Sequence, residues 1–268
     1  MKIIDVGSGT PLVLIPGIQG RWEWMRPAVD ALSRRCRVIT FSLADEPSCG
    51  GHFDRARAFD CYVEQVRTAM DLAGVSSAAV CGVSYAGLIA AAFAARHPER
   101  VSALVLVSAI PPTWTPDARV SFYLRAPRLL MPVFMIASLR MYREIAAATP
   151  GALHGLTAAL RHGANVLRHM FSPQRMAGRV RALEGLSLQQ ELRHVNVRTL
   201  VVTGEPDLDR VVPVSRTREY LRLWPHATHV TLPHTGHLGL ITRPDEFATV
   251  VTSFIGEASR DEVRRRIG

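Results

Sequence analysis

Residues 78–88 read AAVCGVSYAGL, an apolar run that ends at Ser84 and continues directly into a small-residue helical pattern. A serine on such a sharp strand-to-helix turn is the layout of a nucleophile elbow, which exposes the hydroxyl at the carboxyl end of a sheet. The turn is tight, so the positions two before and two after the serine must be small, and here they are Gly82 and Ala86. The usual pattern, G-x-S-x-G, has glycine where this chain has alanine, which still fits. These residues predict a nucleophilic serine, against the alternative of a serine that only caps a buried helix.

The rest of the chain alternates between short apolar runs and longer helical patterns. Runs bounded by glycine, proline or polar residues predict strands at 3–6, 12–15, 37–41, 78–83, 103–107, 199–203 and 229–232. Helical patterns occupy 23–34, 54–73, 86–96, 214–223 and 245–257. Such alternation is typical of βαβ units and predicts an α/β fold with a mostly parallel sheet of seven to eight strands, flanked by helices.

One region breaks this alternation. Between about 113 and 192 there is no convincing strand, and helical patches rich in Leu, Met, Ala and Arg are interrupted by prolines. We expect a helical lid at 113–192, inserted before the strand at 199–203. The α/β core would then consist of 1–112 and 193–268.

The lid is dense in methionine and aromatic residues, which suit an adaptable apolar pocket. The candidate pocket residues are Gly17, Trp22, Trp24, Phe122, Met131 and Met135. Core packing is the alternative for any one of them. The lid arginines that recur at roughly helical spacing are Arg125, Arg128, Arg140 and Arg143. Their spacing predicts a solvated face rather than a site for an acidic substrate or an anionic membrane.

Residues 12–20, LVLIPGIQG, indicate a buried strand followed by a glycine-rich turn. Acyl transfer needs two backbone N–H groups directed at the developing oxyanion. In an elbow layout one belongs to the residue after the serine, Tyr85, and the other to the loop after an early strand, here Ile18. The glycines at 17 and 20 let this backbone approach closely. An ordinary strand-to-helix turn is the alternative.

A general base is expected on the loop after the last strand. His237 follows a glycine beyond the strand at 229–232, which places it within reach of Ser84, and His234 is its rival. A neutral imidazole can take the serine proton and later return it to the leaving group.

The acid that orients this imidazole should follow the preceding strand, at 199–203. The loop 204–213, GEPDLDRVVP, holds three carboxylates. Spacing from the glycine favours Asp207, whereas spacing back from the Val-Val-Pro start of the next helix favours Asp209. We prefer Asp209 and keep Asp207 as the alternative.

Composition limits the class of protein. With 268 residues, 48% of them hydrophobic, the chain can build one large core. No apolar run reaches the ~18 residues that a membrane helix needs, and no signal peptide is visible, so a cytoplasmic protein is expected. The four cysteines lack metal-like spacing and are expected to be free thiols. The net charge of +9 comes from scattered arginines without a dense basic run, which disfavours nucleic acid as a partner.

These motifs together resemble the α/β-hydrolase superfamily over nearly the whole chain, in the order serine, acid, histidine, with a helical lid before the acid-bearing strand. The resemblance implies about eight strands and no cofactor. It carries over Ser84 as nucleophile, His237 as base, Asp209 or Asp207 as acid, and Ile18 and Tyr85 as oxyanion donors. The chain departs from the family at Pro16, where histidine is common, and in the loop 42–51, and it is one N-terminal strand short.

A serine at the elbow indicates acyl chemistry. We expect a serine hydrolase that cleaves an ester-type bond in a small to medium apolar substrate, through a Ser-His-Asp triad and an acyl-enzyme. A carbon–carbon bond hydrolase or a lactonase with the same triad is the first alternative, and a non-catalytic ligand-binding protein on a hydrolase scaffold is the second. The expected partner is a small-molecule substrate, with no metal, no cofactor, no nucleic acid and no stable membrane insertion. The sequence does not indicate an oligomeric state.

Overall fold

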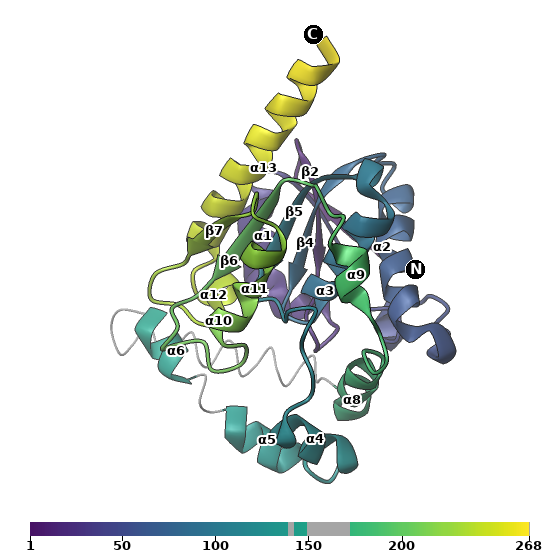
Figure 1. Cartoon of the computed structure of the whole chain (residues 1–268), viewed down its shortest axis with the longest axis vertical. Coiled ribbons are helices and arrows are strands. Elements are labelled where there is room, and N and C mark those ends of the chain that lie inside the picture. The colour runs from purple at the N-terminus through teal and green to yellow at the C-terminus, as the bar shows by residue number, and fades with distance from the viewer. Residues whose placement is uncertain (139–141, 149–171, 268) are drawn as a thin grey trace.

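A seven-stranded sheet forms the centre of the computed structural model, which describes residues 1–138, 142–148 and 172–267 (Figure 1). The strands are β1 (Ile4–Val6), β2 (Pro11–Ile15), β3 (Arg37–Thr40), β4 (Ala78–Val83), β5 (Val101–Val107), β6 (Thr199–Thr203) and β7 (Thr228–Thr231). Their order across the sheet is β1-β3-β2-β4-β5-β6-β7. The β1–β3 pair is antiparallel and the other neighbouring pairs are parallel. The predicted α/β fold with a mostly parallel sheet of seven to eight strands is confirmed.

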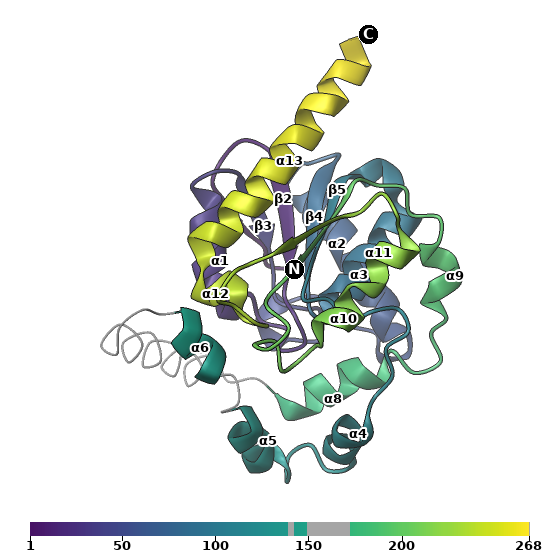
Figure 2. The same ribbon diagram turned by 60° about the vertical axis from the view of Figure 1, so that its left-hand side comes forward.

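Helices cover both faces of the sheet (Figure 2). The described α-helices are α1 (Arg26–Ser33), α2 (Ala58–Leu72), α3 (Ala86–Arg96), α4 (Ala118–Arg125), α5 (Met131–Ser138), α6 (Tyr142–Ala148), α8 (Pro173–Arg181), α9 (Leu188–Leu192), α10 (Val214–Thr217), α11 (Glu219–Leu223), α12 (Gly239–Thr242) and α13 (Pro244–Ile267). The core on one face includes Leu32 of α1 and Phe247 of α13, and the core on the other includes Val63 of α2 and Phe93 of α3.

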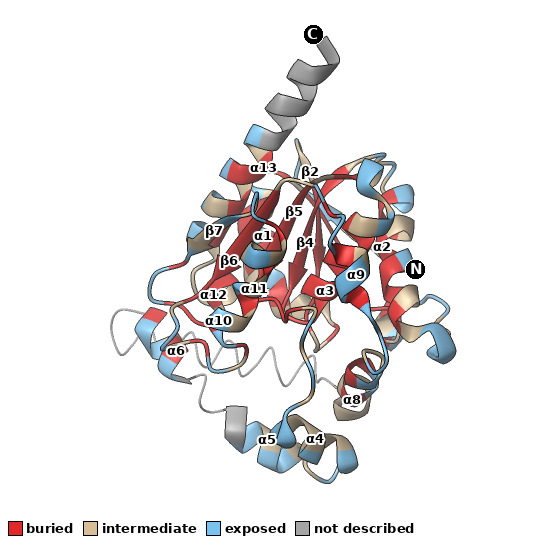
Figure 3. Cartoon of the chain, in the orientation of Figure 1, coloured by how far each residue is buried: buried red, intermediate tan, exposed pale blue. Residues whose placement is uncertain are grey.

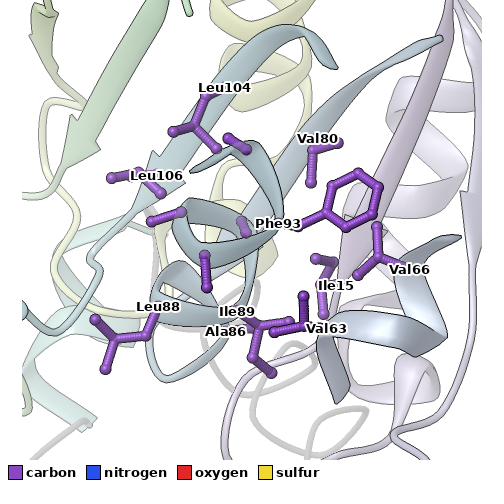
Figure 4. Close-up of a cluster of buried hydrophobic side chains, with 14 of the residues drawn as sticks. Ile15, Val63, Val66, Val80, Ala86, Leu88, Ile89, Phe93, Leu104 and Leu106 are labelled. Carbon is purple, nitrogen blue, oxygen red and sulfur yellow. The ribbon is translucent and has the colours of Figure 1, made fainter. Parts of the chain in front are cut away.

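Alternating side chains of the central strands supply both cores. In β2, Val13 and Ile15 belong to the core under α2 and α3, whereas Leu12 and Leu14 belong to the core under α1 and α13. Figure 4 shows part of the first core, where Ile15 and Phe93 lie close to residues of β4 and β5. Every residue of β4 is buried, as are most residues of β2, β5 and β6, whereas the edge strands β1 and β7 are half-buried or exposed (Figure 3). The strand that precedes Ser84 therefore has little freedom to move.

Two predicted helices differ from the structure in extent. The pattern at 214–223 forms two short helices, α10 and α11, and the Tyr220 hydroxyl of α11 donates to the Ile110 carbonyl in the segment after β5 (2.9 Å). The last helix continues to Ile267 instead of ending at 257. Its apolar pattern stops there, but the following Ala, Glu and Arg residues have high helix propensity.

The described helices between β5 and β6 are α4, α5, α6, α8 and α9. Figures 1 and 2 both show the first four of these helices beyond one end of the sheet. The exception is α9, whose Leu188 and Leu192 belong to the core under α2 and α3. The division into a lid at 113–192 and a core stays a prediction. In the part of the chain that the structure describes, no helix is both long and apolar enough to cross a membrane.

We predict that Gly87→Ala lowers the free energy of unfolding by about 1–3 kcal/mol, the usual cost of overpacking a core. A Cβ at this position would lie 2.3 Å from the Cβ of Ala109, so α3 would have to move away from the segment after β5. Urea denaturation of the wild type and the variant measures the change. Gly178→Ala is the matched control, since nothing lies within 4 Å of a Cβ on that helical glycine. Equal stability of Gly87→Ala and wild type would contradict the close approach.

Candidate active site

Ser84 occupies a sharp turn between β4 and α3. Its φ of 54° lies in the left-handed region, which is uncommon for a residue with a side chain and often marks a functional site. The Ser84 N–H donates to the Val107 carbonyl (2.8 Å), and the Ser84 carbonyl accepts from the Gly87 N–H (3.0 Å). A Cβ at Gly82 would lie 2.3 Å from the Ala86 carbonyl oxygen, so the turn requires glycine there. This geometry is that of a nucleophile elbow.

The turn after β2 lies directly against the elbow. A Cβ on Gly17 would be 3.5 Å from the Cβ of Ser84, and the Gly20 N–H donates to the Gly17 carbonyl (2.9 Å). Because N–H and C=O point in opposite directions in a trans peptide, this bond fixes the direction of the Ile18 N–H. Tyr85 precedes the first residue of α3, where helical N–H groups lack intrahelical partners. Both predicted oxyanion residues therefore adjoin Ser84.

His237 and Asp209 form a buried pair. The Nδ1 atom of His237 is 3.3 Å from Oδ2 of Asp209, and Oδ1 of Asp209 accepts from the N–H groups of Val211 and Val212, each at 3.0 Å. Burial raises the pKa of Asp209, but the charge and hydrogen bond of His237 and the two peptide N–H groups outweigh it. The pKa of Asp209 is therefore lower than that of an ordinary aspartate. An ionised carboxylate of this kind can orient an imidazole and stabilise its protonated form.

The two rival residues lie elsewhere. Asp207 and His234 are both exposed, and the backbone N–H of His234 donates to Glu205 Oε1 (2.7 Å). Glycines bring the loops that carry Asp209 and His237 together, since a Cβ on Gly236 would lie 2.5 Å from the Leu208 carbonyl oxygen. Of the two predicted acids, Asp209 is therefore the one beside His237.

A cavity of about 560 Å³ joins these groups, and both Ser84 and His237 line it. Its wall is mostly apolar, and the residues from the predicted lid include Tyr123, Leu124, Met131 and Phe134. Such a cavity matches the size and character of a site for a small ligand.

Three of the six predicted pocket residues, Gly17, Trp24 and Met131, line this cavity. The other three are not part of the described lining and correct the prediction. Trp22 packs against the core under α1 and α13, while Phe122 and Met135 are 45% and 38% exposed. A high density of methionine and aromatic residues predicts an apolar pocket, but not which of these side chains turn inward. Arg125, Arg128 and Arg143 are exposed, as expected for a solvated face, and Arg140 lies outside the described residues.

Sequence reasoning missed a buried carboxylate beside the histidine. Glu144 of α6 is 1% exposed, and its Oε1 accepts a hydrogen bond from the Leu238 N–H (2.5 Å). Burial raises the pKa of this carboxyl, although the N–H groups of Gly236 and Leu238 and the charge of His237 oppose the rise. No motif surrounds Glu144, and its partner is 94 residues away. The only available signal was a glutamate within an apolar helical segment.

The same reasoning also missed Arg179 of α8, which is fully buried and contacts the turn after β2. The four cysteines are free thiols, as predicted. Across the described ranges, no cluster of three His, Cys, Asp or Glu side chains is arranged to hold a metal ion.

Several known proteins are similar to this chain in sequence or in fold. The 2-hydroxymuconate semialdehyde hydrolase of Pseudomonas sp. (strain CF600) is 28% identical over 95% of this chain and 89% of its own length. The crystal structure of an enol-lactonase from Burkholderia xenovorans LB400 superposes with a TM-score of 0.76, at 20% identity, over 95% of this chain and 96% of its own. An esterase from Exiguobacterium antarcticum superposes with a TM-score of 0.78, at 17% identity, over 95% of this chain and 94% of its own.

The family model for the alpha/beta hydrolase fold matches residues 10–244, which is most of the chain. The resemblance seen in the motifs is thereby confirmed at the level of the family. Together with the parallel sheet and the hydrolases among its relatives, this match identifies the chain as an enzyme that belongs to the alpha/beta hydrolase family.

Proposed function

We propose that this hydrolase cleaves an ester-type bond of a small to medium apolar substrate, with Ser84 as nucleophile, His237 as general base and Asp209 as the orienting acid. One observation carries the proposal: a serine with a left-handed backbone and a histidine paired with a buried carboxylate line the same apolar cavity. Backbone strain of this kind is common at active sites, and here it coincides with a paired histidine at the same cavity, which favours catalysis.

The proposed reaction has two halves. His237 takes the proton of the Ser84 hydroxyl as Oγ attacks the substrate carbonyl carbon. The resulting oxyanion accepts hydrogen bonds from the N–H groups of Ile18 and Tyr85. The intermediate collapses to an acyl-enzyme, and the leaving alkoxide takes the proton from His237. Water then attacks the acyl group by the same steps, which releases the acid and restores the serine.

The charges at the cavity wall support a neutral, apolar substrate. Each of the three arginines in the lining has an acidic partner: Arg21 with Glu23 (2.9 Å), Arg119 with Asp117 (3.4 Å) and Arg216 with Glu219 (2.8 Å). A substrate carboxylate would have to compete with these partners. Most of the remaining lining is aliphatic or aromatic, which favours an acyl or alkyl chain.

A second candidate is hydrolysis of a carbon–carbon bond next to a carbonyl, or of a lactone. The relative named 2-hydroxymuconate semialdehyde hydrolase favours it, since the two chains align over 95% of this one. The proposed catalytic groups would be the same. Weak turnover of generic esters combined with rapid turnover of one diketone or lactone would favour this candidate over an esterase.

We expect a fluorophosphonate probe to label the wild type and not Ser84→Ala, because only an activated serine attacks the phosphorus. In-gel fluorescence measures the labelling. Turnover of p-nitrophenyl esters of increasing acyl length should rise and then fall as the chain exceeds the cavity. Folded wild-type protein that takes no label and turns over no ester would refute the esterase proposal and favour a ligand-binding role.

Asp209→Asn should lower kcat by roughly 10³–10⁴-fold, because an amide cannot stabilise the imidazolium and favours the wrong imidazole tautomer. Asp207→Asn is the matched control and should leave kcat close to wild type, since its side chain is exposed. Comparable losses of kcat in Asp209→Asn and Asp207→Asn would contradict the assignment of Asp209 as the acid.

The lowered pKa of Asp209 also sets a pH dependence of stability. The stability contributed by its pair with His237 is present above the ordinary pKa of aspartate, and it is lost as the pH falls through the lowered pKa.

Glu144→Gln should move the acid limb of the pH profile of kcat/KM to lower pH, because it removes a negative charge beside His237 while retaining an acceptor for the Leu238 N–H. Glu144→Ala also removes that acceptor, and leaving a buried N–H unpaired should cost about 1–3 kcal/mol of stability. Rate measurements across the pH range and urea denaturation give the two results. Glu184→Gln, the same change at an exposed residue before α9, is the control. A profile of Glu144→Gln that superposes on wild type would contradict the electrostatic role.

A further inference from the structure

The guanidinium of Arg179 is a fully buried cation that links α8 to two loops of the core. Its Nη1 donates to the Ile18 carbonyl (2.6 Å), and its Nη2 donates to Asp45 Oδ1 (2.7 Å) and Glu46 Oε1 (2.6 Å). Side-chain exposure of Arg179 and Glu46 is 0%. Burying such charges is costly unless the geometry satisfies them, so each of these contacts restricts the position of the group.

The guanidinium of Arg179 also packs directly against the turn after β2. A Cβ on Gly20 would lie 2.3 Å from the guanidinium carbon, so Arg179 lies directly against the Gly20 backbone, whose φ is 76°. The Gly20 carbonyl in turn accepts from the Leu43 N–H (2.7 Å), on the loop that carries Asp45. The turn is therefore held between Arg179 and the loop after β3.

The contacts of Arg179 matter because of the peptide groups that lie in this turn. The Gly17–Ile18 peptide carries the proposed oxyanion donor, and its carbonyl is held by the Gly20 N–H. Arg179 holds the carbonyl of the next peptide, at Ile18. With the carbonyls of both peptides held, the Ile18 N–H cannot change direction without breaking one of these two hydrogen bonds.

The second proposed donor residue reaches the same cluster through its side chain. The Tyr85 ring packs edge to face on Tyr62, with 6.3 Å between ring centroids. Burial raises the pKa of the Tyr62 phenol, on which the charges of Asp45 and Arg179 also act. Tyr62 therefore lies between Tyr85 and the Arg179 cluster, and the side chains of Tyr62, Tyr85 and Arg179 are buried.

We propose that Arg179 is a positioning residue: through its bonds to Ile18, Asp45 and Glu46, this lid arginine holds the oxyanion-binding turn in its working shape. The inference rests on the proposed function, because it assumes that Ile18 and Tyr85 donate to an oxyanion. Arg179 itself is buried against the turn and touches no reacting atom in this role. Its removal affects the transition state through the turn and leaves ground-state binding in the apolar cavity largely unchanged.

The test compares Arg179→Lys and Arg179→Gln with wild type in steady-state ester hydrolysis. We expect kcat to fall roughly 10-fold to 100-fold, as for a small misplacement of a catalytic group, with KM changed by less than about threefold. The inhibition constant of a trifluoromethyl ketone, whose adduct with the serine places an oxyanion in the hole, should rise in step with the loss of kcat/KM. Arg175→Gln is the matched control, because Arg175 also binds Glu46 (2.9 Å) from α8. It should retain kcat.

Loss of the buried cation leaves Asp45 without its arginine partner and Glu46 with Arg175 alone, so the single variants are at risk of unfolding. Arg179→Met combined with Asp45→Asn and Glu46→Gln removes the charges together, and should fold with the same low kcat. If folded Arg179 variants keep kcat and ketone affinity while wild type is labelled by fluorophosphonate, the proposed function stands and the positioning role is overturned. If the wild type takes no label and hydrolyses no ester, the proposed function fails and the inference fails with it.

Discussion

A serine with a left-handed backbone is the constraint on which the rest of this structure depends. Holding a non-glycine residue in that conformation costs on the order of 1–3 kcal/mol, which the surroundings must offset. Ser84 is held by a hydrogen bond from its N–H to Val107 and another from Gly87 to its carbonyl. Val107 stays in place because β4 and β5 are buried between two layers of helices, and Gly87 because α3 packs closely against Ala109. The core thus supports the strain at the elbow.

The parallel sheet also explains how distant segments reach one site. The carboxyl ends of neighbouring parallel strands meet at one edge, which is where open α/β sheets bind ligands. The loops after β2, β4, β6 and β7 bring Gly17, Ser84, Asp209 and His237 to this edge. Glycines then allow the loops to touch, as at Gly236, where any side chain would collide with the Asp209 loop. The proposed triad needs both the topology and these close approaches.

The sequence was informative where a signal is local. Strand spacing predicted the sheet, and the small residues around Ser84 predicted the elbow. It favoured Asp209 but kept Asp207 as an alternative, because two carboxylates of one loop differ only in how that loop packs. It was also silent on Arg179 and Glu144, whose partners lie 134 and 94 residues away. The pocket prediction failed for Trp22, Phe122 and Met135 because residue type and density carry no information on which side chains turn inward.

Contacts between the predicted lid and the core suggest why relatives with this fold cleave different bonds. Glu144 reaches the His237 loop and Arg179 reaches the turn after β2, while Met131 and Phe134 line the cavity. The same inserted segment therefore shapes the substrate site and touches both halves of the proposed catalytic machinery. A change in the lid that admits a new substrate would also shift the groups that act on it. Relatives that share the core and differ in the bond they cleave are then expected to differ most in this segment.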